Sequence, residues 1–367
     1  MTEQEAYVAF NLTEQVGSVR VSELALRAGS VSAAWELYPN KVARSGGEVD
    51  WRRELAKAEK FGVCVVTPAD EEYPDQLRTA PGHPLALYVK GDVKVLSLPS
   101  IAIVGTRRAT QYGLDQADRL ARDLAADGWA IVSGLALGID AEAHGGALAV
   151  GGVTIGILGS ALDEFYPEEN RELAREIVRK GGAVISEFPF GRPPDQQTFP
   201  QRNHVVAALA RGVIAVEAPA KSGTLITTGI AADLGRVVMA VPGRVDSRSS
   251  AGCLKLIRDG ARLVRSARDV EEELVELFPR TVRSLGGRAP ERPVEDMKRT
   301  DRSPDPPFSL EESMVMRVVD AEGVSLDTIV EKTKLSAAKV NSLCMTLRMK
   351  GRLRFFPGNR VALPREP

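Results

Sequence analysis

The segment 221–224, Lys-Ser-Gly-Thr, follows a short apolar run and opens an apolar stretch with a helical pattern. The run, Val213–Val216, is β-branched in character and lies between Gly212 and Pro219, which predicts a central parallel strand. An ammonium, a hydroxyl and backbone N–H groups then meet at one helix N-terminus, where anions bind. The sequence therefore predicts a phosphate site made by Lys221, Ser222, Gly223 and Thr224.

Three other turns directly follow predicted strands. Gly105-Thr106-Arg107-Arg108 follows the first strand, Ser133-Gly134 the second and Gly159-Ser160 the third. Glycine lets a ligand approach the backbone, and arginine can hold a phosphate with two hydrogen bonds. In an open parallel sheet, ligands lie outside the carboxyl ends of the strands. We therefore expect these turns and segment 221–224 to face one crevice.

The sequence FPQRN, residues 199–203, adds an aromatic ring, a guanidinium and an amide close to the start of a predicted helix. In a nucleic-acid site, Phe199, Arg202 and Asn203 would supply base stacking, a backbone contact and hydrogen bonds to base edges. The alternative is structural: Phe199 packs and Arg202 forms an ion pair. For the turns after the strands, the alternative is likewise structural: they form tight turns or cap helices, and their basic side chains lie in solvent. Several donors directed at one crevice favour a ligand site over capping alone.

Groups suited to catalysis are few. No GxxxxGK[ST] and no complete GxGxxG with a following acidic residue occurs, which argues against a P-loop NTPase and against dinucleotide redox chemistry. The three histidines leave little room for a triad or a metal cluster, and His144 is expected to pack or hydrogen-bond. No catalytic residue, metal or cofactor is therefore expected. Four carboxylates lie near strand ends and could in principle hold two metals: Asp140, Asp163, Glu187 and Glu217. The preferred interpretation is that Glu187 and Glu217 accept hydrogen bonds from loop amides or pair with Arg107 or Arg202, which orders the crevice.

The strands that must position these turns alternate with helices between Ser100 and about Pro279. Buried strands are predicted at 101–104, 130–133, 154–158, 183–186, 213–216 and 237–241. Amphipathic helices are predicted at 113–126, 140–150, 170–179, 202–210 and 224–234. This alternation predicts an α/β fold, a Rossmann-like and mostly parallel sheet with helices on both faces.

Four parts are expected along the chain. Residues 1–75 indicate a small helical domain of the SAM or helix-hairpin-helix kind, and 76–279 an extended Rossmann-like domain whose LALYVKG segment is at most an edge strand. Residues 280–308, with five prolines and mixed charges, indicate a flexible linker. Residues 309–367 predict a winged helix-turn-helix, with three serine-capped helices and a hairpin turning at Pro357-Gly358-Asn359.

Composition sets the remaining bounds. The 367 residues are 44% hydrophobic and 5% aromatic, which fits an α/β protein, and no apolar run of membrane-spanning length occurs. The amino terminus lacks the basic and apolar regions of a signal peptide, which predicts a cytoplasmic protein. The three cysteines are far apart and are expected to be structural thiols. With a net charge of −1, any nucleic-acid surface must be local.

Eight segments, in this order, resemble the DNA-processing protein A family (DprA, also called Smf) of bacterial natural transformation. They are IVGTRRATQYG, SGLALGIDAEAHGGAL, TIGILGSALDEFYPEEN, ISEFP, FPQRN, VEAPAKSGTLITT, VVMAVPG and GCLKLIRDGA. The resemblance covers about Pro74 to Val264, and both terminal domains look like modules of that family. It implies a non-enzymatic protein that binds single-stranded DNA and dimerises. It also implies loading of the recombinase RecA, with relief of the barrier posed by single-strand-binding protein.

The resemblance also assigns residues. The family's DNA pocket carries over to Gly105, Thr106 and Arg107, to Phe199, Arg202 and Asn203, and to segment 221–224. Where the family usually has arginine this chain has His204, which predicts weaker or more pH-dependent DNA binding. The family's dimer contact maps to 252–257, with Leu254 and Ile257 as interface residues; packing within the core is the alternative.

Two rival functions are weighed. A nucleotide phosphoribohydrolase of the lysine-decarboxylase-like (LOG) family would use the same phosphate crevice, but its PGGxGTxxE signature is absent: AKSGTLITTG lacks the paired glycines and the glutamate. The winged helix could instead recognise duplex DNA. Its basic and polar residues fit a DNA face or a solvated one: Lys339, Asn341, Arg348, Lys350, Arg352, Arg354 and Arg360.

Overall fold

The computed structural model describes residues 1–13, 16–39, 41–44, 46–275, 310–320, 323–349, 353–356 and 360–363. The chain forms two compact units, 1–290 and 291–367, each described by itself. The linker predicted at 280–308 lies outside the described residues. The division into four parts stays a prediction.

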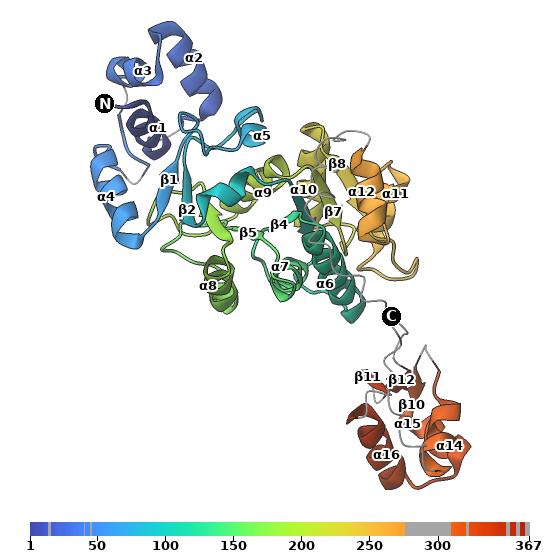
Figure 1. The fold of residues 1–367 in the computed structure, drawn as a ribbon. Helices are drawn as coiled ribbons and strands as arrows, with labels where there is room; N and C mark the ends of the chain where they lie inside the picture. The colour runs from blue at the N-terminus through green and yellow to red at the C-terminus, as the bar shows by residue number, and fades with distance from the viewer. Residues whose placement is uncertain are drawn as a thin grey trace. The chain divides into compact units, whose positions relative to one another are not determined.

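A nine-stranded sheet organises the first unit (Figure 1). Its order is β1-β2-β6-β5-β4-β3-β7-β8-β9; β1 and β2 run antiparallel to their neighbours, and the other pairs are parallel. The strands are β1 Cys64–Val66, β2 Leu87–Gly91, β3 Ser100–Val104, β4 Ala130–Ser133, β5 Thr154–Ile157, β6 Ala183–Ser186, β7 Gly212–Ala215, β8 Val237–Ala240 and β9 Arg262–Leu263. The mostly parallel α/β fold predicted from the alternation is confirmed.

Helices cover both faces of this sheet (Figure 1). They are α5 Asp75–Arg78, α6 Gln111–Ala126, α7 Ile139–Ala149, α8 Arg171–Arg179, α9 Thr198–Leu209, α10 Gly223–Asp233, α11 Ala251–Arg258 and α12 Ala267–Val275, with 3-10 turns η1 Val93–Ser97 and η2 Glu168–Asn170. The five predicted helices correspond to α6 to α10. The largest difference in a helix start is at α9, which begins at Thr198, so Phe199, Arg202 and Asn203 lie within the helix rather than at or before its start.

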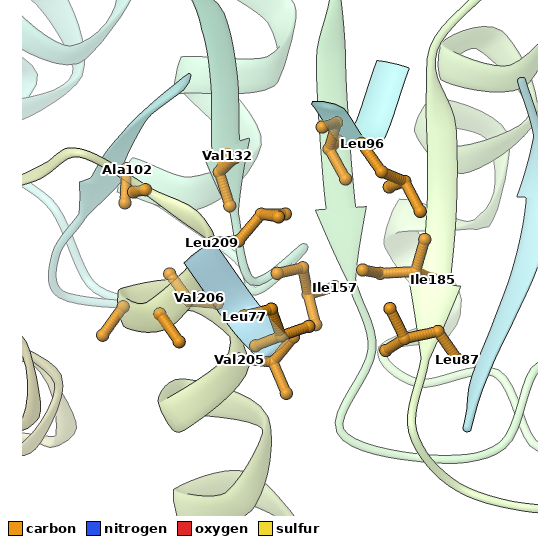
Figure 2. Close-up of a cluster of buried hydrophobic side chains, with 14 of the residues drawn as sticks. Leu77, Leu87, Leu96, Ala102, Val132, Ile157, Ile185, Val205, Val206 and Leu209 are labelled. Carbon is orange, nitrogen blue, oxygen red and sulfur yellow. The ribbon is translucent and has the colours of Figure 1, made fainter. Parts of the chain in front are cut away.

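Alternate residues of the central strands pack on opposite faces, because side chains of a strand point alternately to its two sides. Ala102 and Val132 pack with α9 residues such as Val205 and Leu209, as Figure 2 shows. Ile101 and the other side chains of opposite parity pack against α6, α7 and α12. Burial on both faces explains why these strands read as continuous apolar runs in the sequence.

The amino-terminal helices pack on the antiparallel end of the sheet. They are α1 Glu3–Leu12, α2 Ser18–Ala28, α3 Val31–Leu37 and α4 Trp51–Phe61. Phe10 of α1 meets Trp35 of α3 edge to face at 5.1 Å, and Val8 packs with residues of α4, β1 and β2. Strand β1 lies before residue 75, so the predicted helical segment also contributes a strand. The prediction that LALYVKG is an edge strand is wrong, because β2 pairs with both β1 and β6.

The second unit has the predicted winged-helix arrangement. Its elements are α14 Leu310–Val318, β10 Val324–Ser325, α15 Leu326–Thr333, α16 Ala337–Met349, β11 Arg354–Phe356 and β12 Arg360–Ala362, with sheet order β10-β12-β11. Val315, Ile329, Val340 and Leu347 share its core. The Ser325 hydroxyl accepts from the Thr328 N–H at 3.1 Å, as expected of an N-cap. The predicted turn 357–359 lies outside the described residues.

Two remaining expectations concern membranes and thiols. Among the described helices, none is both long and apolar enough to cross a bilayer. All three cysteines are free; Cys253 and Cys344 are buried, as structural thiols would be, whereas Cys64 is exposed. Cys64 lies in the short strand β1 with its side chain exposed, so the prediction of a structural thiol does not fit there.

Candidate nucleic-acid interface

The loops after β3 and β7 meet where the strand order reverses. From β3 the chain proceeds outward through β4, β5 and β6, then returns to the other side of β3 for β7 and β8. Such a switch point leaves a crevice at the carboxyl ends of the two strands. A cleft of about 580 Å³ lies there. The predicted residues that line it are Gly105, Thr106, Arg107, Arg108, Gly134, Phe199, Arg202, Asn203, Lys221, Ser222, Gly223 and Thr224.

Glu217 holds the loop after β3 in place. Its carboxylate accepts from the Thr110 N–H and hydroxyl, both at 2.8 Å, and from the Ser249 hydroxyl at 2.7 Å. Its carbonyl oxygen accepts from the Thr106 N–H at 2.7 Å. The sequence-based prediction that Glu217 orders the crevice through loop amides is therefore confirmed, and Thr106, Arg107 and Arg108 follow a fixed path past the end of β7.

Two glycines permit close packing behind the same loop. A Cβ on Gly105 would lie 2.5 Å from Ile139 Cγ1, so this glycine makes room for the start of α7. Gly138 has φ of +78°, and a Cβ there would lie 2.5 Å from the Thr106 carbonyl oxygen. Gly105 was predicted to let a ligand approach the backbone. The space that a side chain at this position would fill is taken by Ile139 instead.

Arg107 stacks on an aromatic ring at the cleft. Its guanidinium carbon lies 5.0 Å from the centroid of the Phe199 ring, and the Tyr166 ring lies 6.1 Å from the same ring. A Cβ on Gly159 would lie 2.8 Å from Phe199 Cδ1, so this glycine admits the ring. Phe199 is half-buried and Tyr166 is exposed. The pair therefore offers flat apolar surface beside a cation, the combination on which unpaired bases stack.

Arg202 is buried beneath the cleft. It is 5% exposed, and its guanidinium donates to the carbonyl oxygens of Gly134 and, at 2.8 Å, of Ile157. Asp140 is also buried; burial raises its pKa, and Arg202 together with the Gly134 N–H at 3.1 Å opposes that rise. Burial in turn lowers the pKa of Arg202. The structural alternative for Arg202 thus describes its geometry best: it ties α9 to the ends of β4 and β5.

The start of α10 presents hydrogen-bond donors that have no partner within the helix. Ser222 occupies the N-cap position without a side-chain cap bond, and its buried hydroxyl has no hydrogen-bond partner among the described residues. The first N–H groups of a helix have no partner within the helix. Lys221, directly before them, is exposed. This arrangement can receive an anion, as predicted from the sequence.

The cleft carries an excess of positive charge. Arg107, Arg108 and Lys221 are exposed, and none of the three forms an ion pair with any residue that the structure describes. Asp140 is the one carboxylate among the described lining residues, and it faces Arg202. The potential is thus locally positive although the chain as a whole is near neutral.

Some predicted site residues lie elsewhere. The Ser133 hydroxyl points inward, donating to the Ile103 carbonyl at 2.6 Å, and Ser160 is fully buried. Gly159 lines a small pocket beside the cleft with Arg107 and Tyr166. Neither serine can reach a ligand in this arrangement, because Ser133 is the buried last residue of β4 and Ser160, in the loop after β5, is fully buried.

The candidate carboxylates do not converge. Asp163 pairs with Lys57 at 2.7 Å. Glu187 lines a different cavity from the cleft, so the prediction that it orders the crevice, in which pairing with Arg107 or Arg202 was one alternative, is wrong. In the part of the chain that is described, no group of three or more potential metal ligands occurs. His144 is buried with Nδ1 2.6 Å from Thr154 Oγ1, and burial lowers its pKa to about 3. It packs and hydrogen-bonds, as predicted.

His204 and the interface candidates fall outside the cleft. His204, on α9, lines the same second cavity as Glu187. Ile257 of α11 packs partly into the core beside Cys253, whereas Leu254 is half-buried and belongs to no core cluster. The dimer contact stays a prediction. Leu254 is a better candidate than Ile257 for a residue of that contact.

The winged helix shows part of its predicted DNA face. Lys339 and Asn341 are exposed on α16, and Lys339 pairs with Glu311 at 3.1 Å. The Arg360 guanidinium donates to the Gly323 carbonyl at 2.6 Å. The side chains of Arg348 and Arg354, and the residues Lys350 and Arg352, lie outside the described part.

Comparison with known proteins assigns the chain to a family. The model of the family described as DNA recombination-mediator protein A matches residues 64–275, more than half of the chain. The chain belongs to this family. A second model, the DprA winged helix domain, matches residues 299–359. The resemblance seen in the eight sequence segments is therefore confirmed for both units.

Relatives of this DprA/Smf family match over most of the chain. Protein Smf of Synechocystis sp. is 30% identical over 392 residues, covering 98% of each chain. DNA processing protein DprA of Bacillus subtilis is 39% identical over 225 residues, 61% of this chain and 75% of its own. The Synechocystis alignment spans both the terminal modules and the central sheet.

Two solved DprA structures share the fold. The one from Streptococcus pneumoniae has a TM-score of 0.62 at 32% identity and covers 74% of this chain and 98% of its own. The one from Helicobacter pylori, described by its single-stranded DNA binding mode, has a TM-score of 0.53 at 32% identity, over 58% of this chain and 97% of its own.

Sequence reasoning missed two contributors to the site. Tyr166, in the loop after β5, extends the surface around Phe199, and Gly138 shapes the loop that carries Arg107. An aromatic residue in a loop after a strand was the available signal for Tyr166. Gly138 had no such signal, because its role depends on a contact with a loop distant in sequence.

Proposed function

We propose that this DprA-family chain binds single-stranded DNA in the cleft between the loops after β3 and β7. The observation that carries the proposal is the convergence of three exposed cations, Arg107, Arg108 and Lys221, on one cleft where no described residue pairs with them. Phosphates of a strand would contact these cations and the start of α10. Bases would stack beside Phe199 and Tyr166.

The geometry of the cleft and the similarity to a relative both support this proposal. An unpaired strand needs a basic groove for its backbone together with flat rings for its bases, and the cleft has both. The Helicobacter pylori relative, similar in fold and sequence, is described as binding single-stranded DNA. A duplex would hide its bases from Phe199, so we expect a preference for single strands over duplex in this cleft.

We infer that the chain holds DNA without catalytic turnover. The Asp140 carboxylate already accepts from the Gly134 N–H and faces Arg202, so it is not poised to transfer a proton. A phosphoribohydrolase would release free base from nucleoside monophosphates. Incubation with the four monophosphates, followed by chromatography, should show no free base.

The role we propose for the bound strand is recombination mediation. The family description, DNA recombination-mediator protein A, supports mediation in general. In this role the chain would act as a homodimer in the cytoplasm and load a RecA-type recombinase onto incoming single-stranded DNA, in transformation or repair. Single-strand-binding protein would be displaced or bypassed in that step. Deletion of residues beyond 290 removes the winged helix and should leave single-strand binding in place, whereas any duplex binding that this unit provides should be lost.

A mobility-shift titration with single-stranded and duplex DNA of equal length tests this function, together with light scattering for the dimer. We expect shifts with the single strand at lower protein concentration than with the duplex. Equal affinity for both in the chain ending at residue 290, which lacks the winged helix, would contradict the proposed use of the cleft. A RecA filament assay on DNA covered with single-strand-binding protein then tests mediation separately.

A further inference from the structure

A second and larger cavity, of about 730 Å³, lies between the amino-terminal helices and the sheet. The start of α2, the loop before β2, the loop after β6 and the outer side of α9 contribute to it. Pro200 is the one described residue that lines both this cavity and the cleft. The two sites are therefore neighbours on opposite sides of the first turns of α9.

Glu187 places an unsatisfied acceptor at this cavity. Its Oε1 atom is buried and has no hydrogen-bond partner among the described residues. Burial raises the pKa of this carboxyl to about 7, and the charge of Arg44, another lining residue, opposes the rise. A buried acceptor without a partner costs folding free energy. A ligand that donates hydrogen bonds here would remove that cost.

Ser18 places a second unsatisfied group in the same cavity. It is the first residue of α2, is 5% exposed, and its hydroxyl has no hydrogen-bond partner among the described residues. The preceding Gly17 provides no side-chain cap, so the first N–H groups of α2 remain available there. Arg20 follows on the same turn and lines the cavity too, but its guanidinium already pairs with the Glu23 carboxylate at 3.0 Å. The helix N-terminus and the unpartnered hydroxyl are therefore the groups that suit an anion here.

The walls between these polar ends are apolar or flat. Phe188, Leu85 and Ile230 line the cavity, as do the rings of His83 and His204. Burial lowers the pKa of both histidines, so their rings are neutral near pH 7. Neutral rings and aliphatic side chains accept the faces of a planar heterocycle. The volume lies within the range of pockets that hold small organic ligands.

We propose that this cavity binds a guanine nucleotide. The N–H groups of the base donate hydrogen bonds to the Glu187 carboxylate, and Ser18 holds the phosphate at the start of α2. Guanine presents two adjacent donors, N1–H and the 2-amino group, on one edge, which matches a carboxylate. Adenine presents an acceptor at N1 and does not. In the bound state the Glu187 carboxylate turns towards the base, and the Ser18 hydroxyl donates to a phosphate oxygen.

The nucleotide can come from two sources. It is either a free nucleotide or a guanine nucleotide of the DNA strand that passes from the cleft around Pro200. The second source rests on the proposed function, whereas the first does not. Both require the same contacts, so one set of variants tests the site and the choice of probe distinguishes the sources.

Calorimetric titration of the full chain with GMP at pH 8 tests the site, with AMP as the mismatched ligand. We expect GMP to bind, and AMP to bind at least about tenfold more weakly. With adenine one hydrogen bond to the carboxylate is lost, and the acceptor N1 faces a carboxylate oxygen. Glu187→Gln should weaken GMP binding about tenfold or more, and Ser18→Ala should weaken GMP and AMP alike. Glu59→Gln, on the exposed surface of α4, is the matched control and should change nothing.

No detectable binding of GMP, equal binding of AMP, or unchanged GMP affinity in Glu187→Gln would each overturn the proposal. Thermal unfolding of each variant confirms that it is folded. The variant Arg107→Ala/Arg108→Ala/Lys221→Ala separates the test of this cavity from the test of the DNA-binding cleft. It should lose oligothymidylate binding yet bind GMP like the wild type. Loss of GMP binding in that variant would mean that the cavity is not a separate site, which contradicts the proposal.

Oligonucleotides then identify the source. If the strand supplies the nucleotide, oligothymidylate carrying one guanine should bind more tightly than pure oligothymidylate, and Glu187→Gln should abolish the difference. If the free nucleotide is the ligand, the two oligonucleotides bind equally while GMP still binds. Either result supports the site and assigns its source.

Discussion

The guanidinium of Arg107 lies over the ring of Phe199, with its central carbon 5.0 Å from the ring centroid. This contact joins the loop after β3 to the first turn of α9, two segments far apart in the sequence. It fixes a cation at the edge of an aromatic surface rather than leaving the arginine to move freely in solvent. The cleft is thus preorganised on one side for a phosphate and its base.

Phe199→Ala should weaken binding of single-stranded DNA without changing how binding depends on salt. A base stacked on an aromatic ring contributes about 1–3 kcal/mol, and the substitution removes no charge. Fluorescence anisotropy with oligothymidylate at several salt concentrations measures both quantities. Phe199→Tyr, which keeps a ring, is the control and should retain affinity. A parallel loss of slope would show that Arg107 had moved as well.

Glu217→Ala should lower both stability and DNA affinity. It removes a buried carboxylate that accepts three hydrogen bonds and leaves Thr110 and Ser249 without their acceptor. We expect the free energy of unfolding to fall by about 2–4 kcal/mol. Urea unfolding measures it. Glu59→Ala on the exposed face of α4 is the control, expected within about 0.5 kcal/mol of the wild type.

Stability should depend on pH through Glu187. Burial raises its pKa from 4.5 to about 7, so the folded chain binds this proton more tightly than the unfolded chain does. The folded state therefore carries no penalty below about pH 4.5, and its free energy of unfolding falls by about 3 kcal/mol as the pH rises from there to the folded pKa. Arg44, which opposes the shift, and His83, His204, Arg20 and Glu23 line the same cavity.

Comparison with Glu187→Gln isolates that contribution. The variant has no proton to lose, so it should be more stable than the wild type at pH 8 and close to it at pH 5. Urea midpoints at the two pH values give the comparison. A stability difference that is the same at both pH values would show that Glu187 does not titrate in this range.

Leu254→Glu should shift the oligomeric state without unfolding the chain. Leu254 is half-buried on α11 and belongs to no core cluster, whereas Ile257 packs beside Cys253. A charge at position 254 would oppose burial in a dimer contact but cost the monomer little. Light scattering should report a monomer for Leu254→Glu and a dimer for the wild type. The same mass for both would remove Leu254 from the interface.

Sequence patterns predicted the sheet and most of its helices, because strands buried on both faces are continuous apolar runs and the helices between them are amphipathic. β2 was misjudged because an antiparallel strand at the end of a parallel sheet resembles an edge strand. Its partner β1 has only three residues, which is too short for a pattern to emerge. The start of α9 was predicted at 202, whereas the helix begins at Thr198 and includes Pro200 in its first turn, where proline fits.

The candidate cleft was predicted from residue types that follow strands, and twelve of the fifteen proposed residues line it. Arg202 could not be recognised as buried, since a guanidinium that ties down carbonyl oxygens has the same sequence signature as one that holds a phosphate. Ser133 and Ser160 were included because a turn of small residues does not reveal where its strand ends. The cavity around Glu187 depends on contacts between the amino-terminal helices and α9, which no local pattern encodes.

The most direct test of the account is the salt dependence of single-strand binding in Arg107→Ala/Arg108→Ala/Lys221→Ala. Each lost phosphate contact should lower the slope of log affinity against log salt by about 0.7, so the slope should fall by about 2. The control Arg53→Ala/Lys180→Ala, at exposed sites that do not line the cleft, should keep the wild-type slope. An unchanged slope and affinity in the cleft variant would contradict the account, because the DNA would then lie elsewhere.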